Sequence, residues 1–254
     1  TFVVNFGQDS SFAGTETAQG NADGNGVGDF YYSPPSGFLA LCSQNLPDAE
    51  IIDGSEHFDT SLWTGSGSDR SITGLNFSPD WVWTKSRNVA NSHYIFDSVR
   101  GTLQALKSDS TAIESTQADS LESFTSDGYT LGTNSNVNVA GGYTFVGWSW
   151  LAGTAFSNDA SATGVGTIDS TGQVNTKAGF SIVAYTGTGS NATVAHGLSA
   201  APELYIVKYR NSAGDWKVYS EAVGNTYQGY LNGTYAFTNT GAAIWNNTSP
   251  TSTV

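Results

Sequence analysis

The sequence is short of charge, and basic residues are the scarcest. Only 12% of its 254 residues are charged, whereas about 25% is usual in soluble domains. Acidic residues number 22 and basic residues 9, so the formal net charge is −13. This charge repels phosphate backbones and anionic lipid surfaces. No apolar run approaches the ~20 residues that a membrane-spanning helix needs. We therefore expect neither a nucleic-acid nor a membrane partner.

Cysteine and methionine are nearly or wholly missing. Cys42 is the only cysteine, which excludes a disulfide within the chain, and its neighbours in GFLALCSQ predict a buried hydrophobic side chain. No methionine occurs, even at position 1. The chain is then either processed or a piece of a longer polypeptide, and we favour the second interpretation.

Glycine and aromatic residues are abundant instead. There are 30 glycines, 13 phenylalanines, 12 tyrosines and 7 tryptophans. Such a composition favours short strands joined by turns. The sequence predicts an all-β protein built of β-sandwich modules.

One stretch of the chain occurs twice. WTGSGSDRSITGLNFSPDWVWTKSR (residues 63–87) aligns with YTGTGSNATVAHGLSAAPELYIVKYR (residues 185–210), with one gap after Thr73 and 9 identities in 25 pairs. The similarity continues more weakly downstream, where DSVRG (97–101) matches SEAVG (220–224). We interpret the two stretches as a duplicated module, and we call its two occurrences the first copy and the second copy.

Each copy has a local strand pattern. SLWTGSGSDRSITGL predicts two strands joined by a hairpin turn at its glycines. DWVWTK and ELYIVK are apolar at successive positions, which predicts strands buried on both faces in the centre of a sheet. Tyr143–Trp150 alternates as a strand that completes the first copy,. The second copy has no such segment before Val254, so we expect that the natural polypeptide continues or that a neighbouring chain supplies the missing strands.

These patterns divide the chain into four parts. We expect a first domain in residues 1–50, the first copy in residues 51–153, a small polar linker in residues 154–166, and the second copy, incomplete at its C-terminal end, in residues 167–254. The sequence also predicts a short helix at residues 91–106.

The sharpest ligand-like spacing is NADGNGVGD. Oxygen-bearing side chains at its first, third, fifth and ninth positions, around Gly26, resemble the start of a calcium loop. The twelfth position is Tyr32 rather than a bidentate glutamate, so a plain surface loop is the favoured interpretation and calcium is the alternative. The candidate calcium ligands are Asn21, Asp23, Asn25 and Asp29.

Paired tryptophans suggest a sugar-stacking platform, because Trp81 and Trp83 lie on one face of a predicted strand. Their counterparts in the second copy are Leu204 and Ile206, which cannot stack on sugar rings. Core packing is therefore the favoured interpretation of all four residues.

Four of the nine basic residues occupy one repeated place. They could bind an acidic sugar or the carboxylates of a partner. Pairing with acids of their own module, such as Asp97 or Glu221, is the favoured interpretation. These candidate contact residues are Lys85, Arg87, Lys208 and Arg210.

No catalytic motif stands out. The three histidines lack metal-ligand spacing, and the chain contains no GxSxG elbow, no GxxxxGK[ST] phosphate loop and no cysteine near a base,. Acid pairs such as Asp119 and Glu122 are expected among 22 acids and do not indicate glycoside hydrolysis. The sequence predicts a protein that is not an enzyme and has no cofactor other than the calcium considered above.

Long phrases of the sequence resemble one group of proteins. VVNFGQDSSFAG and GVGDFYYSPPSGFLALCSQNLP are similar to the end of the SPRY-like, concanavalin-like sandwich domain in large virion proteins of tailed bacteriophages of marine and cyanobacterial hosts. HFDTSLWTGSGSDRSITGLNFSPDWVWTKSR, SHYIFDSVRG, LESFTSDGYTLG and YTFVGWSW are similar to the β-modules that follow that domain. The resemblance covers nearly the whole chain. It implies a SPRY-like sandwich end in residues 1–50 followed by two repeats, and it brings no catalytic residues.

The resemblance also implies a role: a structural and adhesive component of a phage virion, placed in a tail fibre, beside the baseplate or as a capsid decoration. Repeated modules lengthen an appendage and multiply weak contacts. Particle symmetry implies a homo-oligomer that contacts other virion proteins and a host cell-surface glycan. Two alternatives stay open. One is a free-standing carbohydrate-binding protein with exposed aromatic platforms, and the other is a polysaccharide-degrading tailspike with two carboxylates about 5–10 Å apart.

Overall fold

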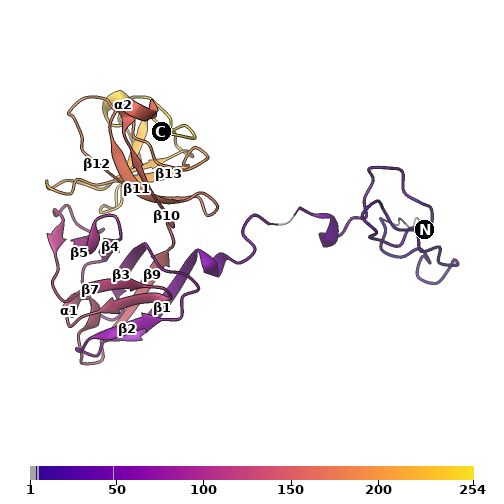
Figure 1. Ribbon diagram of the computed structural model, residues 1–254, viewed down its shortest axis with the longest axis horizontal. Helices are drawn as coiled ribbons and strands as arrows, with labels where there is room; N and C mark the ends of the chain where they lie inside the picture. The colour runs from indigo at the N-terminus through magenta and orange to yellow at the C-terminus, as the bar shows by residue number, and fades with distance from the viewer. Residues whose placement is uncertain (1–3, 5, 48) are drawn as a thin grey trace. The chain divides into compact units, whose positions relative to one another are not determined.

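The fold is all-β, as the composition predicts. The computed structural model describes residues 4, 6–47 and 49–254 (Figure 1). The chain divides into two compact units, Thr1–Ile52 and Asp53–Val254. Antiparallel sheets dominate, and helices are limited to single turns. Among the described residues, no helix has the length and apolar character needed to cross a membrane.

The first unit has little regular structure in its described part. It contains the 3-10 turn η1 (Ser43–Asn45) and an isolated antiparallel bridge between Asn21 and Phe30. No named strand of a sandwich end occurs in residues 4, 6–47 and 49–52, so the SPRY-like assignment of residues 1–50 stays a prediction. The expected burial of Cys42 is wrong, because this residue and its neighbour Leu41 are exposed. No sheet of this part covers them.

The first copy is a two-sheet sandwich. Its larger sheet has the order β1-β9-β3-β4-β5-β6, preceded in the chain by the turn η2 (Gly54–Glu56). The predicted strand at Tyr143–Trp150 is confirmed as β9, which pairs with β1 on one edge and with β3 on the other. The strands are β1 (Phe58–Thr64), β3 (Trp81–Ser86), β4 (Tyr94–Asp97), β5 (Gly101–Leu106), β6 (Ser115–Thr116) and β9 (Thr144–Trp150).

The smaller sheet of the first copy has the order β2-β8-β7, with β2 (Arg70–Thr73), β8 (Gly128–Leu131) and β7 (Leu121–Thr125), followed by helix α1 (Ser135–Asn138). An aromatic core lies between the sheets, where Trp63 stacks on Phe145 with ring centroids 5.6 Å apart and contacts Tyr129 edge-on. The predicted hairpin is wrong: β1 and β2 belong to different sheets, so the Gly/Ser segment between them crosses from one sheet to the other.

Residues 91–106 form no helix, contrary to the sequence-based prediction. They contain β4 and β5, which pair with each other. All four residues of β4 are buried, because one face meets the sandwich core and the other meets the second copy. Burial on both faces favours a central strand over a helix, whatever the local propensity.

The second copy contains two sheets. The sheet β10-β11-β12 consists of β10 (Thr154–Asn158), β11 (Ser170–Asn175) and β12 (Phe180–Tyr185). The sheet β13-β14-β15-β16 consists of β13 (Leu204–Val207), β14 (Lys217–Ser220), β15 (Tyr227–Tyr230) and β16 (Thr238–Asn239), followed by η3 (Gly241–Ala243).

The segment predicted as a linker is structured. Residues 154–166 contain β10, which pairs with β11, and helix α2 (Ala160–Thr163). The Asp159 side chain caps α2 by accepting hydrogen bonds from the N–H groups of Ser161 and Ala162, and Gly164 ends it in the left-handed conformation at φ 68°,. A small polar segment therefore gains its order from a partner strand and a helix cap, neither of which composition reveals.

The duplication is visible in strand register. In the first copy Trp81 lies opposite Asp97 in the β3–β4 pair, and in the second copy the aligned residue Leu204 lies opposite Ser220 in the β13–β14 pair. One flanking hydrogen bond also recurs, because Ser98 donates its N–H to the Asp80 carbonyl and Glu221 donates to the aligned Glu203 carbonyl. The order β3-β4-β5-β6 is thus repeated as β13-β14-β15-β16.

The two copies pack against each other through the outer face of the larger first-copy sheet. Phe180 of β12 contacts Trp81 edge-on and stacks on Trp150, with centroids 6.2 and 6.0 Å away. Trp216 of the second copy is buried against Ile95 and Leu106, and its Nε1–H donates to the Lys107 carbonyl at 2.8 Å. The interface explains why the outward tryptophans of β3 and β9 are partly buried.

The core-packing interpretation is confirmed for the two tryptophans and wrong for their counterparts in the second copy. Trp81 and Trp83 are partly buried against the Ile95 cluster, as expected. Their counterparts are not core residues, because Leu204 is 59% and Ile206 is 40% exposed. The cause is position: β3 is an inner strand of its sheet, whereas β13 is an edge strand.

Candidate functional site

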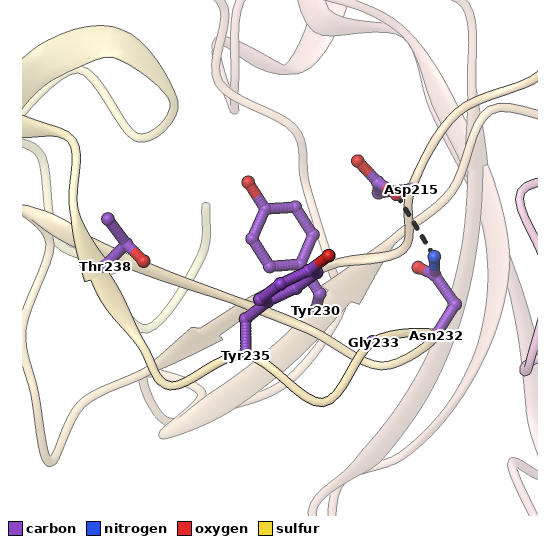
Figure 2. A pocket seen from close by; sticks show the side chains of 6 residues that line it. All are labelled: Asp215, Tyr230, Asn232, Gly233, Tyr235 and Thr238. Atoms are coloured by element: carbon purple, nitrogen blue, oxygen red, sulfur yellow. Dashed lines mark hydrogen bonds between the residues drawn. The ribbon is translucent and has the colours of Figure 1, made fainter.

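An open pocket of about 630 Å³ lies in the second copy, where the connection from β15 to β16 passes the loop before β14. Figure 2 shows two tyrosine rings at its centre, with a carboxylate and an amide on one side and a threonine on the other. The lining residues are Asp215, Tyr230, Asn232, Gly233, Tyr235 and Thr238.

The polar side of the pocket is held in place by hydrogen bonds. Asn232 donates from Nδ2 to Asp215 Oδ1 at 3.1 Å and accepts at Oδ1 from the Trp216 N–H at 2.8 Å. Lys217 Nζ lies 3.6 Å from Asp215 Oδ2 and 4.2 Å from the centre of the Tyr230 ring. The carboxylate and the amide are thus oriented before any ligand arrives.

The aromatic side of the pocket presents an exposed ring. Tyr235 is 77% exposed, and its ring lies edge-on to Tyr230, with centroids 6.2 Å apart and planes 74° apart. The Tyr230 hydroxyl accepts a hydrogen bond from Gln228 Nε2 at 2.7 Å. A large exposed ring beside fixed polar groups can stack on an apolar face of a ligand while the carboxylate and amide bind its hydroxyl groups.

The candidate calcium ligands form hydrogen bonds with other residues of the first unit. Asp23 accepts hydrogen bonds from the N–H groups of Asn25, Val27 and Ala40, and the bond from Ala40 is the main reason why its pKa falls to about 2. Burial opposes this shift. The carboxylate is ionised and bound to backbone donors.

The other three candidate ligands have partners of their own. Asp29 accepts from both the N–H and the hydroxyl of Ser10, Asn21 donates to the Phe30 and Tyr31 carbonyls, and Asn25 donates to Asn45. Within the described part of the chain, no group of three or more His, Cys, Asp or Glu side chains is placed to hold a metal ion. The calcium alternative rests on spacing alone.

The four repeated basic residues have separate partners. Lys85 donates to the carbonyls of Ser86 and Val89, and Lys208 donates to the carbonyls of Thr111 and Tyr209. Arg87 is exposed, and among the described residues its side chain makes no hydrogen bond or ion pair. The structure does not join these side chains in one anion-binding site.

Arg210 bonds across the two copies. Its guanidinium bonds twice to Glu114 of the first copy, which also bonds to Arg100. The expected partners Asp97 and Glu221 are therefore wrong: Asp97 pairs with Arg100 instead. The reason is tertiary, because copy-to-copy packing brings residues 114 and 210 together, and sequence separation gives no hint of it.

The pocket was missed from the sequence. Its residues come from 215 and from 230–238, and only packing of β14 beside β15 joins the two parts. A weak signal was present in GYLNGTYAF, where two tyrosines flank an Asn-Gly turn. Such a turn presents its flanking side chains on one short loop.

The fold and pocket define an all-β protein of two packed, related copies with an open aromatic and polar pocket in the second. The family described as "Domain of unknown function (DUF7483)" matches residues 53–254, and the chain belongs to this family. No curated protein and no solved structure matches the chain.

Proposed function

We propose that this protein is a non-enzymatic structural component of a tailed-phage virion and that it adheres to host cell-surface glycans through the Tyr235 pocket. The observation that carries the adhesive part is the exposed Tyr235 ring beside the fixed Asp215–Asn232 pair. The virion part rests on the resemblance of the sequence to virion proteins.

The pocket chemistry supports sugar binding. A pyranose ring presents an apolar face to an aromatic ring and hydroxyl groups around its rim. Asp215 supplies acceptors, Asn232 supplies a donor and an acceptor, and Lys217 supplies a cation beside them. The pocket is open, which suits one or two sugar units of a surface polymer rather than a buried metabolite. Low affinity at one site is offset when many copies bind one surface.

Binding is favoured over cleavage at this site. Glycoside hydrolysis uses two carboxyl groups about 5–10 Å apart. The six residues that line the pocket include one carboxylate, Asp215, and it is already bonded to Asn232 and close to Lys217.

The adhesive function is tested by glycan binding with a matched pair of variants. Immobilised protein is screened against bacterial surface polysaccharides, and a bound polymer is then titrated against Tyr235→Ala and Tyr32→Ala. Both side chains are exposed, at 77% and 80%, but only Tyr235 lines the pocket. We expect about a tenfold loss of affinity for Tyr235→Ala and none for Tyr32→Ala. Equal losses, or no binding to any polysaccharide, would contradict the proposal.

The virion assignment needs a separate measurement, because a free-standing carbohydrate-binding protein would also bind glycans. Peptide mapping of purified, DNA-containing particles is expected to recover peptides of this chain. Recovery only from particle-free material would favour the free-standing alternative.

A further inference from the structure

Strand β9 fills a central place in the first copy. It lies between β1 and β3 and runs antiparallel to both. At one end of it, Gly65 donates its N–H to the Tyr143 carbonyl at 2.8 Å and Arg87 donates to the Thr144 carbonyl at 2.7 Å. The strand thus joins two edges that would otherwise have no partner.

The corresponding place in the second copy contains no strand among the described residues. Strand β12, the counterpart of β1, ends its sheet, and β13, the counterpart of β3, ends the other. The residues aligned with Gly65 and Arg87 are Gly187 and Arg210, and in the described part of the chain their N–H groups have no backbone acceptor. The Arg210 carbonyl instead accepts a hydrogen bond from the Glu114 N–H of the first copy. No strand in the described part of the chain pairs with the outer edge of β12 or of β13, whereas the first copy has a complete sheet at this place.

Side-chain exposure shows the same difference. In the first copy Trp63, Phe145 and Ser86 lie side by side across β1, β9 and β3, and all three are buried. The aligned residues on either side of the unfilled place are Tyr185 and Tyr209, which are 43% and 64% exposed.

The glycines give a third comparison. A Cβ on Gly65 would lie 2.0 Å from the Val139 carbonyl oxygen, because the chain leading to β9 packs on this glycine. A Cβ on Gly187 would meet nothing within 4 Å.

We propose that the free edges of β12 and β13 form an acceptor for a β-strand donated by a separate polypeptide. The donated strand has the pattern of β9: about seven residues, antiparallel to both edges, with an aromatic side chain inserted between Tyr185 and Tyr209 as Phe145 lies between Trp63 and Ser86. Strand addition of this kind gains affinity from backbone hydrogen bonds and specificity from alternate side chains.

A second copy of this chain is a poor donor. Its own β9 is an inner strand, Phe145 is fully buried and Val146 is 8% exposed, so donating it would open the sandwich of the donor. We assign the donated strand to another protein, with an extended segment of alternating aromatic and small residues. Exposed strand edges attract such segments unless they are covered.

The test uses the β9 sequence itself as the donor. A peptide of residues 141–153, GGYTFVGWSWLAG, is titrated into the 254-residue protein by calorimetry, and the same peptide with Phe145→Asp is the control. We expect one peptide to bind per chain and to raise the melting temperature, while the control peptide binds at least tenfold more weakly.

Two protein variants assign the binding to the acceptor. The Arg87 N–H bonds to the Thr144 carbonyl, and backbone N–H groups alternate in direction along a strand, so the N–H of Trp83 also faces β9. Ile206 is the counterpart of Trp83, and its N–H therefore faces the acceptor. Proline is tolerated at an edge position whose N–H faces solvent, but it removes the donor. We expect Ile206→Pro to abolish binding and Ile206→Thr to retain it. Tyr185→Ala, which keeps every backbone group, should weaken binding about fivefold through loss of aromatic stacking.

Three results would overturn the proposal. The first is that the peptide does not bind. The second is that it binds Ile206→Pro and Tyr185→Ala as tightly as the unchanged protein, as exchange with the β9 of the first copy would cause. The third is a dimer of the chain that excludes the peptide and is lost in Ile206→Pro, which would make a second copy the occupant.

Discussion

Arg210 of the second copy and Glu114 of the first form a two-bond ion pair, with Nε to Oε2 at 3.0 Å and Nη2 to Oε1 at 2.8 Å. Glu114 Oε2 also accepts from Arg100 Nη1 at 3.0 Å, and the Arg100 side chain is only 6% exposed. One carboxylate therefore binds two guanidinium groups and links the two copies. The Glu114 N–H adds a further link by donating to the Arg210 carbonyl.

Removing the charge of Glu114 should destabilise the Asp53–Val254 unit. Glu114→Gln leaves the buried Arg100 with one anionic partner instead of two. It also breaks the ion pair that Glu114 forms with Arg210 through two hydrogen bonds. We expect the free energy of unfolding to fall by about 3 kcal/mol, measured by urea denaturation. Glu122→Gln is the matched control, because Glu122 is exposed and its loss should cost less than about 0.5 kcal/mol. Equal effects of the two variants would contradict a linking role for Glu114.

Stability should also depend on Glu114 at acid pH. Burial alone would raise the pKa of this carboxyl, but its bonds to Arg210 and Arg100 outweigh burial, and the pKa lies below its ordinary value of 4.5. The unfolded chain therefore binds the proton more readily. The stabilising contribution is complete above about pH 4.5 and is lost as the pH falls through the lower pKa of the folded state.

This pH dependence can be measured by comparing denaturation curves between pH 3 and pH 7. The unchanged protein should lose stability more steeply below pH 4.5 than Glu114→Gln does, so the two curves converge in acid. Parallel curves would show that Glu114 titrates alike in the folded and unfolded chains.

Gly147 in the middle of β9 should tolerate no side chain. A Cβ at this position would lie 2.3 Å from the Tyr129 hydroxyl oxygen and 3.1 Å from the Trp63 ring, in a closed core. We expect Gly147→Ala to cost about 1–3 kcal/mol of unfolding free energy by overpacking. Gly54→Ala is the control, because a Cβ there meets nothing within 4 Å. A neutral Gly147→Ala would show that the aromatic core can shift.

Asp23 should stay ionised well into acid. Its pKa of about 2, which the Ala40 N–H lowers most, predicts that its carboxyl carbon titrates in the NMR spectrum far below the ordinary 3.8. The part of the loop stability that Asp23 provides is present above pH 3.8 and is lost only as the pH falls toward 2. Asp23→Asn should shift the amide resonances of Val27 and Ala40.

The same NMR spectrum tests the calcium alternative. Because the Asp23 oxygens already accept backbone N–H groups, we expect added CaCl₂ to leave the resonances of residues 21–29 unchanged. Saturable shifts confined to those residues would instead establish a calcium site.

Local patterns in the sequence were enough for several features of the fold. The alternation in YTFVGWSW identified β9, because a half-buried strand repeats every two residues. The identities between residues 63–87 and 185–210 identified the duplication, and the matching register of β3–β4 and β13–β14 follows from it. These features depend on neighbours along the chain, so the sequence alone determined them.

Features that depend on partners distant in the chain required the tertiary structure. It decided that β1 and β2 lie in different sheets, that residues 154–166 gain order by pairing with β11, and that Leu204 and Ile206 lie on an exposed edge while Trp81 and Trp83 pack against the other copy. It also brought Asp215 to Tyr235 and Glu114 to Arg210. The physical reason is that a strand or side chain is stabilised mostly by burial against the residues that cover it. Its own sequence does not tell whether those residues are present.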